Sequence, residues 1–255
     1  MPFLRLAAGS IEYEDIPARY AGRPTLALLH EGLGSLSLWR DFPAQVAAAT
    51  GCRTVVWSRA GYGQSDPAPA PRTPRYMHDE ALTAMPQLFA ALAVERPVLI
   101  GHSDGGSIAL IHASAFPASV AGVVVLAPHE FVEDEALAGI RRAGEWWRNG
   151  DWRERLARHH RDPEKVFYDW HDTWLAPAFR DWNIEAGLSA IQCRLLAIQG
   201  EDDEYATMRQ IDVIAERLPH AELLKLRDCG HSPHRDQPAA VLAALQDFLG
   251  IRIHD

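Results

Sequence analysis

Short apolar runs alternate with amphipathic stretches along most of this 255-residue chain. Six runs have the length of a buried strand: 25–30, 53–57, 97–101, 120–127, 194–200 and 221–226. Between them, apolar residues recur at helical spacing, most clearly over 77–94, 105–116, 207–218 and 237–249. Strands that are apolar throughout are typical of parallel sheets covered on both faces. The pattern predicts an α/β fold, with a mostly parallel sheet and helices on both faces.

The first residues differ from these runs, with apolar side chains at Leu4, Leu6, Ile11 and Tyr13. Their spacing suggests a short antiparallel hairpin at one edge of the sheet. With the two strands of this hairpin counted first, the run at 120–127 becomes the sixth strand of the sheet.

The alternation of strand and helix signals breaks once, between Leu126 and Arg194. About sixty residues there contain several helical pieces and no convincing strand. A structureless loop of that length is uncommon inside a compact domain. We therefore expect residues 1–131 and 191–255 to form the α/β core domain, and residues 132–190 to form a helical insertion after the sixth strand.

The insertion holds six of the eight tryptophans: Trp146, Trp147, Trp152, Trp170, Trp174 and Trp182. One interpretation is that these side chains pack the insertion onto the core domain. The other is that one or two of them line a ligand pocket, where aromatic side chains are common. Trp146 and Trp174 are the candidates for this second role.

Charge and composition exclude one class of partner. Hydrophobic residues make up 47% of the chain and charged residues 23%, the usual mix for a soluble globular protein. The formal net charge is -9, from 25 basic and 34 acidic residues, and no block is rich in Lys and Arg. Because a nucleic-acid-binding protein needs a basic footprint, we expect no nucleic-acid partner.

The three cysteines, Cys52, Cys193 and Cys229, are widely spaced and fit neither a disulfide framework nor a zinc site. The N-terminus lacks the apolar segment of a signal peptide. No run approaches the roughly 20 apolar residues of a transmembrane helix. We expect a cytoplasmic protein without a membrane partner, present as a monomer or a homodimer.

The strongest local motif is the run G-H-S-D-G-G at 101–106. It directly follows a predicted strand and opens a predicted helix. A G-x-S-x-G motif in this context is typical of a nucleophile elbow, a sharp strained turn that presents the serine. Small residues flank the serine because neighbouring backbone lies close. We expect Ser103 to be a nucleophile above a helix N-terminus that favours developing negative charge.

A serine nucleophile needs a base, and the base needs an orienting acid. Four acids at 201–204 follow one predicted strand, and His231 follows the next. The carboxyl ends of strands are where open α/β sheets build their sites. Where such a sheet carries a nucleophile elbow, the three groups follow one another along the chain in the order Ser, acid, His. We expect His231 to be the base, with His234 as the competing histidine. The residues alone leave the choice among the four acids open.

With these motifs the chain resembles the α/β-hydrolase superfamily, in its capped serine-hydrolase branch, over almost its whole length. The resemblance implies an α/β-hydrolase fold in which the insertion at 132–190 is a cap. In that family the acid stands in a G-x-x-D pattern after the strand, which points to Asp203. Asp202 and Glu204 remain the alternatives. The family's histidine, which follows a glycine, matches His231.

The loop after the strand at 25–30 reads H-E-G-L-G-S and is similar to the family's H-G-x-x-G-S. In this fold an oxyanion hole combines a backbone N–H of that loop with the N–H of the residue after the nucleophile. The resemblance assigns these two groups to Gly32 and Asp104, with Leu33 next in line. The loop departs from the family at Glu31, where glycine is usual.

Three carboxylates are expected near the nucleophile: Asp104, Glu31 and, at the end of another strand, Glu130. A carboxylate about 6 Å from an oxyanion would oppose it by roughly 3 kcal/mol at an effective dielectric of about 20. Such a group is either turned away and hydrogen-bonded to nearby backbone, or it meets a cationic group of the substrate. The second reading favours amino-acid-like esters, and G-x-S-D-G-G resembles amino-acid ester hydrolases of the superfamily. Glu31, Leu33 and Glu130 are therefore candidate substrate-binding residues.

The function that we expect is hydrolysis of a small carboxylic ester, or of an amide or lactone, by Ser103, His231 and Asp203. One alternative is a carbon–carbon bond hydrolase with the same triad. The other is a non-catalytic protein of this fold that binds small molecules. We expect a small-molecule substrate as the partner, and no cofactor. We also expect no metal, because adjacent histidines such as those at 159–160 point to different faces of a helix and cannot share one ion.

Overall fold

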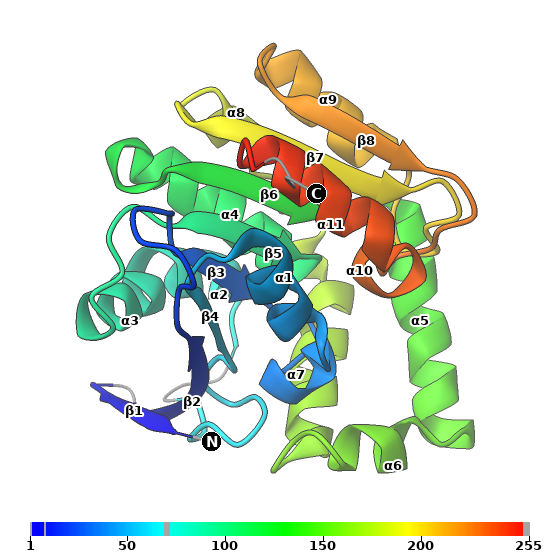
Figure 1. Ribbon diagram of the computed structural model, residues 1–255. Helices are drawn as coiled ribbons and strands as arrows, with labels where there is room; N and C mark the ends of the chain where they lie inside the picture. Colours follow the sequence, from blue (N-terminus) through cyan, green and yellow to red (C-terminus); the bar gives the residue numbers. More distant parts are fainter. Residues whose placement is uncertain (1, 8, 69–71, 252–255) are drawn as a thin grey trace.

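Eight strands form one sheet in the computed structural model, which describes residues 2–7, 9–68 and 72–251. Their order across the sheet is β1-β2-β4-β3-β5-β6-β7-β8 (Figure 1). Neighbouring strands from β4 to β8 pair in parallel, whereas β1 and β2 form an antiparallel edge. The bounds are β1 Phe3–Leu6, β2 Gly9–Ile16, β3 Leu26–Leu29, β4 Thr54–Trp57, β5 Val98–His102, β6 Gly122–Leu126, β7 Arg194–Gly200 and β8 Glu222–Leu226. The predicted α/β fold is confirmed, including its N-terminal hairpin. Residue 1 and residues 252–255, at the two ends of the expected core domain, lie outside the described residues.

The central strands are buried on both faces, which explains their continuous apolar runs. Leu26 and Leu28 of β3 belong to one apolar cluster, and Ala27 and Leu29 belong to the other. Successive side chains of a strand point to opposite faces, so one run supplies two cores. Helices cover both faces: α1 (Phe42–Thr50) and α11 (Pro238–Phe248) on one, and α3 (Met85–Ala91), α4 (Asp104–Ala115) and α9 (Arg209–Arg217) on the other.

The helix expected over 77–94 is divided into three pieces. They are α2 (Tyr76–Asp79), the π-helical turn η2 (Glu80–Ala84) and α3. Pro86 has no N–H to donate to the carbonyl group four residues earlier, and the wider π turn precedes it. The apolar pattern does not predict α1, because four of its nine residues are alanine and the contrast between its faces is weak.

Between β6 and β7 the chain forms the insertion helices: α5 (Asp134–Asn149), α6 (Trp152–Ala157), α7 (Pro163–Leu175) and α8 (Glu185–Leu188). Aromatic packing joins α5 to α7, since the Trp147 indole stacks on the Phe167 ring with centroids 4.2 Å apart. Figure 1 shows α5, α6 and α7 together beyond one edge of the sheet, on the side toward which β7 and β8 point. Part of the tryptophan set therefore serves packing within this segment.

Candidate active site

Ser103 lies at the sharp turn between β5 and α4, in a strained backbone conformation. Its φ of 53° and ψ of -120° fall where non-glycine residues are rare. The Ser103 N–H donates to the Leu126 carbonyl of β6 at 2.9 Å, which anchors the turn to the sheet. A side chain at Gly101 would collide with the backbone of Gly105, and one at Gly105 with the backbone of Leu29. Close backbone contacts therefore explain why glycines flank the serine.

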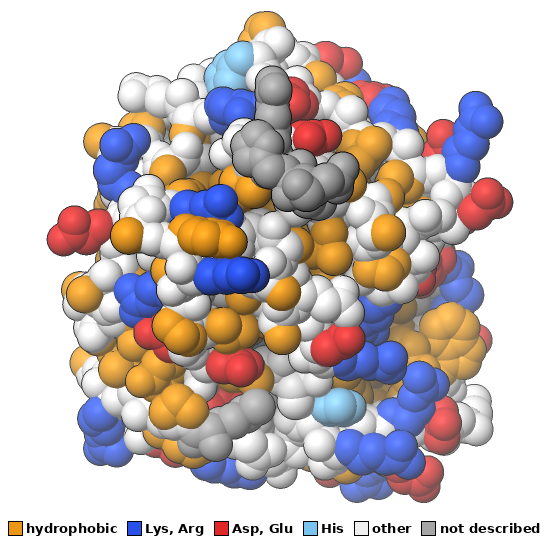
Figure 2. All heavy atoms as spheres, in the orientation of Figure 1, with side chains coloured by type: hydrophobic (Ala, Val, Ile, Leu, Met, Phe, Trp, Pro, Cys, Tyr) orange, Lys and Arg blue, Asp and Glu red, His pale blue; other side chains and the backbone are white. Residues whose placement is uncertain are grey.

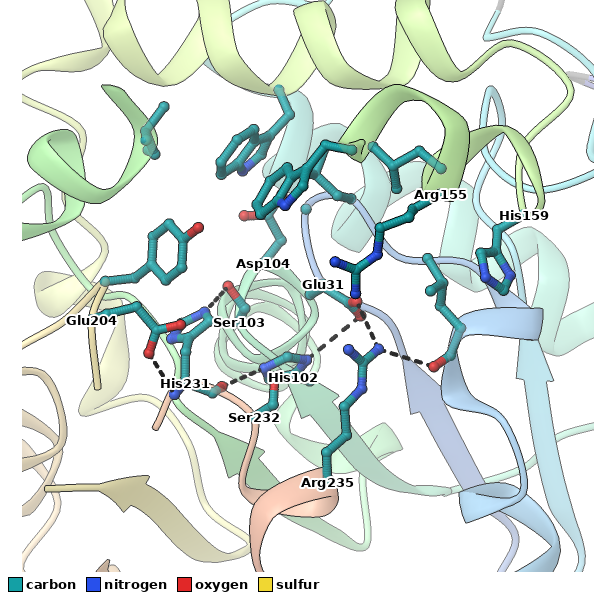
Figure 3. Close-up of a pocket in the computed structure, with 18 of the residues that line it drawn as sticks. Glu31, His102, Ser103, Asp104, Arg155, His159, Glu204, His231, Ser232 and Arg235 are labelled. Carbon is teal, nitrogen blue, oxygen red and sulfur yellow. Dashed lines mark hydrogen bonds and ion pairs between the residues drawn. The ribbon is translucent and has the colours of Figure 1, made fainter. Parts of the chain in front are cut away.

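Side chains from three separate loops form one hydrogen-bonded chain. His231 Nε2 lies 2.9 Å from Ser103 Oγ, and His231 Nδ1 lies 2.8 Å and 3.0 Å from the two carboxylate oxygens of Asp203. Figure 3 shows the Ser103 hydroxyl and the His231 imidazole facing each other. Because the Asp203 carboxylate can only accept, it favours a proton on Nδ1 and leaves Nε2 free to accept from the serine. This is the geometry of a nucleophile, a base and an orienting acid.

Of the four consecutive acids at 201–204, Asp203 is the one whose carboxylate contacts the His231 ring. Its side chain is 1% exposed and also accepts from the Tyr205 N–H at 2.9 Å. Glu204 instead accepts from the backbone N–H of His231 at 3.1 Å. Asp202 is exposed at the protein surface. The structure therefore brings Asp203 to the imidazole and leaves its two alternatives away from the ring.

The two ionisable partners shift each other's pKa. Burial would raise the pKa of Asp203, but the charge and hydrogen bond of His231 and the N–H of Tyr205 lower it below its ordinary value. Burial alone would lower the pKa of His231, whereas Asp203 and then Glu204 and Glu31 raise it, and the raising effects prevail. The arrangement strengthens His231 as an acceptor for a serine proton.

His234, the competing histidine, is a buried packing group. Its ring lies 4.7 Å from the Trp39 ring and 4.8 Å from the His102 ring, measured between centroids. Neither of its ring nitrogens has a hydrogen-bond partner among the described residues. Burial, with a contribution from His102, holds the pKa of His234 well below its ordinary value. The histidine that contacts Ser103 is His231, three positions earlier.

Ser103 and His231 line a cavity of about 470 Å³. Most of the site residues that the sequence predicts line this cavity, together with side chains from the insertion helices. The predicted residues that line it are Glu31, Gly32, Leu33, Ser103, Asp104, Trp146, Trp174 and His231. Asp203 supports the site from behind His231, with its own side chain almost fully buried.

Glu130 is the predicted substrate-binding residue that the structure leaves outside this lining. Its side chain is fully buried, and neither carboxylate oxygen has a hydrogen-bond partner among the described residues. Burial raises the pKa of Glu130 well above its ordinary value, and the charges of Glu133 and Glu185 raise it further. A position at the end of a strand does not decide the direction of a side chain. The Glu130 side chain points into the protein interior and not into the cavity.

Sequence reasoning missed much of the rest of the lining. Trp170 and Trp174 stand four residues apart on α7, so both project from one face of the helix into the cavity; this spacing is a signal that could have identified Trp170. Tyr205 follows directly on the acidic run. The charged members give no local signal: Arg40, Arg155, Arg158 and Arg235.

Asp104 lines the cavity but is already engaged. Its Oδ2 accepts from the Tyr76 hydroxyl at 2.6 Å, and the Tyr76 oxygen accepts from the Trp174 indole N–H at 3.1 Å. Arg59 Nη1 lies 4.0 Å from the same carboxylate oxygen. Asp104 Oδ1 has no hydrogen-bond partner among the described residues. The partner of Asp104 is thus a phenol rather than nearby backbone, and Arg59 offsets part of its charge.

Glu31 lies between two basic side chains. Its Oε2 is 3.5 Å from His102 Nδ1, and its Oε1 is 3.6 Å from Arg235 Nη2 (Figure 3). Burial would raise the pKa of Glu31, but His102 and then Arg235 hold it well below the ordinary value. His102 also donates from Nε2 to the His231 carbonyl at 2.7 Å. Glu31 therefore supports the loop of His231 through His102.

Two backbone N–H groups are available beside Ser103. Gly32 and Asp104 both line the cavity, and among the described residues neither N–H donates to a backbone carbonyl. Asp104 is the first residue of α4, where N–H groups have no acceptor within the helix. A side chain at Gly32 would collide with the Trp170 indole, so this loop position needs a glycine.

The part of the chain that the structure describes shows no sign of a metal site or a membrane span. There, no group of three or more His, Cys, Asp or Glu side chains could hold a metal ion. None of the helices in the same ranges is long and apolar enough to cross a membrane. Cys52, Cys193 and Cys229 are unpaired.

Comparisons with known proteins agree on one family. Residues 26–245 match the model described as the alpha/beta hydrolase family. The 2-succinyl-6-hydroxy-2,4-cyclohexadiene-1-carboxylate synthase of Enterobacter sp. (strain 638) is 27% identical over 92% of this chain and 95% of that protein. The serine hydrolase BPHL of Mus musculus is 26% identical, covering 89% of this chain and 80% of its own. A carboxylesterase structure from the thaumarchaeon Nitrososphaera gargenis has the same fold, with a TM-score of 0.78 at 23% identity and 98% of both chains covered.

Proposed function

The chain belongs to the alpha/beta hydrolase family, and on that premise we propose that it hydrolyses a small carboxylic ester. Ser103 attacks the ester carbonyl, while His231 takes the hydroxyl proton and returns it to the leaving alcohol. Asp203 orients the imidazole and stabilises its charged form. The acyl group stays on Ser103 until a water molecule, activated by His231, releases the acid.

One observation carries the proposal: the hydrogen-bonded chain from Ser103 through His231 to Asp203 at the edge of a cavity. Each link lies between 2.8 and 3.0 Å, within the range expected for a nucleophile and its base. The name of the relative BPHL, a serine hydrolase, supports the same chemistry. A serine at this turn also argues against those reactions of the fold in which an aspartate is the nucleophile.

We assign the oxyanion hole to the backbone N–H groups of Gly32 and Asp104. As the tetrahedral intermediate forms, the carbonyl oxygen gains negative charge, which two fixed donors stabilise better than mobile water does. Removing one donor of this kind typically costs about 10²–10³ in kcat. The α4 N-terminus, which begins at Asp104, adds a favourable dipole.

We assign residues 132–190 to a cap over this site, carried by the core at 1–131 and 191–255. Support comes from the side chains that these helices contribute to the cavity lining, among them Ile140, Leu156 and Trp170. A cover of this kind excludes bulk water from the reacting ester and strengthens the electrostatic contacts inside.

The test is the substitution Ser103→Ala in the full chain, assayed with p-nitrophenyl acetate and butyrate and with a fluorophosphonate label. We expect loss of turnover by roughly 10⁴-fold or more, because the members of a triad act as a unit, and loss of labelling. Ser114→Ala is the matched control, since Ser114 lies in α4, the helix that follows Ser103, and outside the cavity lining. Labelling that persists in Ser103→Ala would refute the assignment.

A further inference from the structure

The rim of the cavity carries four arginines that the proposed chemistry does not use. They are Arg40, Arg155, Arg158 and Arg235, and we call them the arginine rim. They come from the end of the 3-10 helix η1 (Leu36–Trp39), from α6 and its C-terminal cap, and from α10 (Pro233–Asp236). The whole chain has a formal net charge of -9, so the opening gathers charge of the sign opposite to that of the protein.

The guanidinium groups of the rim have few partners. Among the described residues, no carboxylate lies within 4.0 Å of Arg40 or Arg158. Arg155 has Asp151 at 3.8 Å, one turn earlier on the chain, and its side chain is 62% exposed. Figure 2 shows Lys and Arg side chains, with some Asp and Glu side chains among them, at the lower right of the face, over the region where Figure 1 places α6. Arg235 pairs with Glu31 at 3.6 Å, so Arg40 and Arg158 are the two rim arginines whose charge has no carboxylate partner among the described residues.

His159 provides a second observation on the same region. Its Nδ1 lies 2.9 Å from the Ser37 hydroxyl. Burial lowers the pKa of His159, and the charges of Arg235, Arg40 and Arg158 lower it further, against a smaller opposing effect of Glu31. Three arginines from three segments thus act on one place at the cavity.

One lining carboxylate, Glu31, offsets part of this charge by pairing with Arg235, and the others have different partners. Glu31 is held by His102 and Arg235, and Figure 3 shows Arg235 reaching it from α10. Asp104 accepts from a buried phenol. Glu204 accepts from the backbone of the loop that carries His231. No lining carboxylate contacts Arg40 or Arg158 among the described residues.

The other walls of the cavity are apolar and aromatic. Ala136 and Ile140 of α5, Trp170 and Trp174 of α7, and Tyr205 beside the acidic run all line it. A substrate that fills the cavity therefore meets an apolar wall in one part and arginines at the rim. Such a site selects molecules in which an apolar group and an anion flank the reactive bond.

We propose that the arginine rim binds an anionic group, a carboxylate or a phosphate, carried by the substrate away from its scissile ester bond. The inference rests on the proposed function, because it assigns the substrate class of the same cavity. Guanidinium groups present paired N–H donors that match the oxygens of carboxylates and phosphates. Esters that carry an anion are preferred to neutral isosteres, and esters that carry an amine are disfavoured.

The test separates binding from turnover by using the Ser103→Ala protein. The change of tryptophan fluorescence reports binding, since Trp146, Trp152, Trp170 and Trp174 line the cavity. The probes are benzyl hydrogen glutarate, its neutral methyl ester, benzyl 4-aminobutyrate and benzyl 4-(phosphonooxy)butyrate. We expect the two anionic probes to bind at least about tenfold more tightly than the methyl ester, a difference of about 1.4 kcal/mol. The tighter of the two identifies the anion as carboxylate or phosphate.

The matched variants locate the preference on the rim. In the Ser103→Ala background, Arg155→Gln with Arg158→Gln removes two rim charges, and Arg153→Gln with Arg180→Gln removes two charges outside the lining. Arg153 and Arg180 are paired with Glu164 and Asp134 on the surface of the same insertion. We expect the first pair to reduce the ratio of neutral to anionic Kd to near one, and the second pair to leave it unchanged.

Three outcomes would overturn the inference: equal Kd for the anionic and neutral probes, tighter binding of the amine, or an equal loss of preference in both variant pairs. Failure of the proposed function looks different. In that case the wild-type protein takes no fluorophosphonate label and turns over no ester, while the binding preference of the Ser103→Ala protein persists.

Discussion

The floor and the rim of the cavity are built in opposite ways. At the floor, His231 lies 2.8–3.0 Å from both Ser103 and Asp203, and the Asp203 side chain is 1% exposed. At the rim, the Arg155 side chain is 62% exposed, and Arg158 has no carboxylate within reach among the described residues. Reacting atoms tolerate only small displacements, whereas Coulomb attraction falls slowly with distance and works through mobile side chains. The floor therefore depends on geometry, and the rim depends on charge.

Hydrogen bonds hold the loops of the floor to the sheet and to one another. The Ser103 N–H donates to Leu126 of β6, His102 donates to the His231 carbonyl, and Glu204 accepts from the His231 N–H. Corresponding ties for Arg40 and Arg158 side chains are absent among the described residues. The contrast predicts that single changes at the floor are severe and specific, and that changes at the rim are graded.

The largest effect should come from Asp203→Asn. The amide would present a donor to His231 Nδ1 and favour the wrong tautomer, so we expect kcat to fall by roughly 10⁴-fold. Steady-state turnover of p-nitrophenyl butyrate measures the loss. Asp202→Asn and Glu204→Gln are the controls and should cost far less. If Asp202→Asn were the crippling change, the orienting acid would be one position earlier than the geometry indicates.

The pH dependence of the floor should be the next largest effect. Ester attack needs the neutral imidazole, and Asp203 raises the pKa of His231 above its ordinary value of 6.5 although burial lowers it. Activity should therefore fall as the pH drops through this raised pKa. In Asp203→Asn the raising charge is gone and burial remains, so the pKa should move down. NMR titration of the His231 ring in both proteins measures the shift, and a pKa that does not move would break the argument.

The smallest effect should come from salt, and it should separate the rim from the floor. The screening length is about 30 Å at 0.01 M salt and about 3 Å at 1 M. Over this range we expect the preference for an anionic ester over its methyl ester to shrink severalfold, because the rim arginines are exposed. The kcat for the neutral ester should change little, since the floor is buried. The kcat/KM ratio of the two esters reports the difference, and a ratio independent of salt would contradict a charge-based rim.

Local sequence patterns predicted the strands of the fold and three of its main helices, α4, α9 and α11. The exceptions have physical reasons: α1 is rich in alanine, and the helix expected over 77–94 is interrupted before Pro86. At the site, the motif around Ser103 and the position of His231 were readable because a tight turn and a strand end are local features. Glu130 shares such a position, yet its side chain is buried away from the cavity.

The sequence by itself determined the α/β order, the strained turn and the set of side chains to which we assign ester chemistry. These follow from hydrophobic period and from glycines placed where backbones touch, which are properties of neighbouring residues. The residues alone left open which of four adjacent acids meets His231, although the family resemblance pointed to Asp203. Tertiary structure decided that contact, and also which tryptophans line the cavity rather than pack the insertion. It also decided that Arg40, Arg158 and Arg235 share one rim. Residues so far apart in the chain come together only when separate loops and the insertion converge on one edge of the sheet, and no local pattern records that convergence.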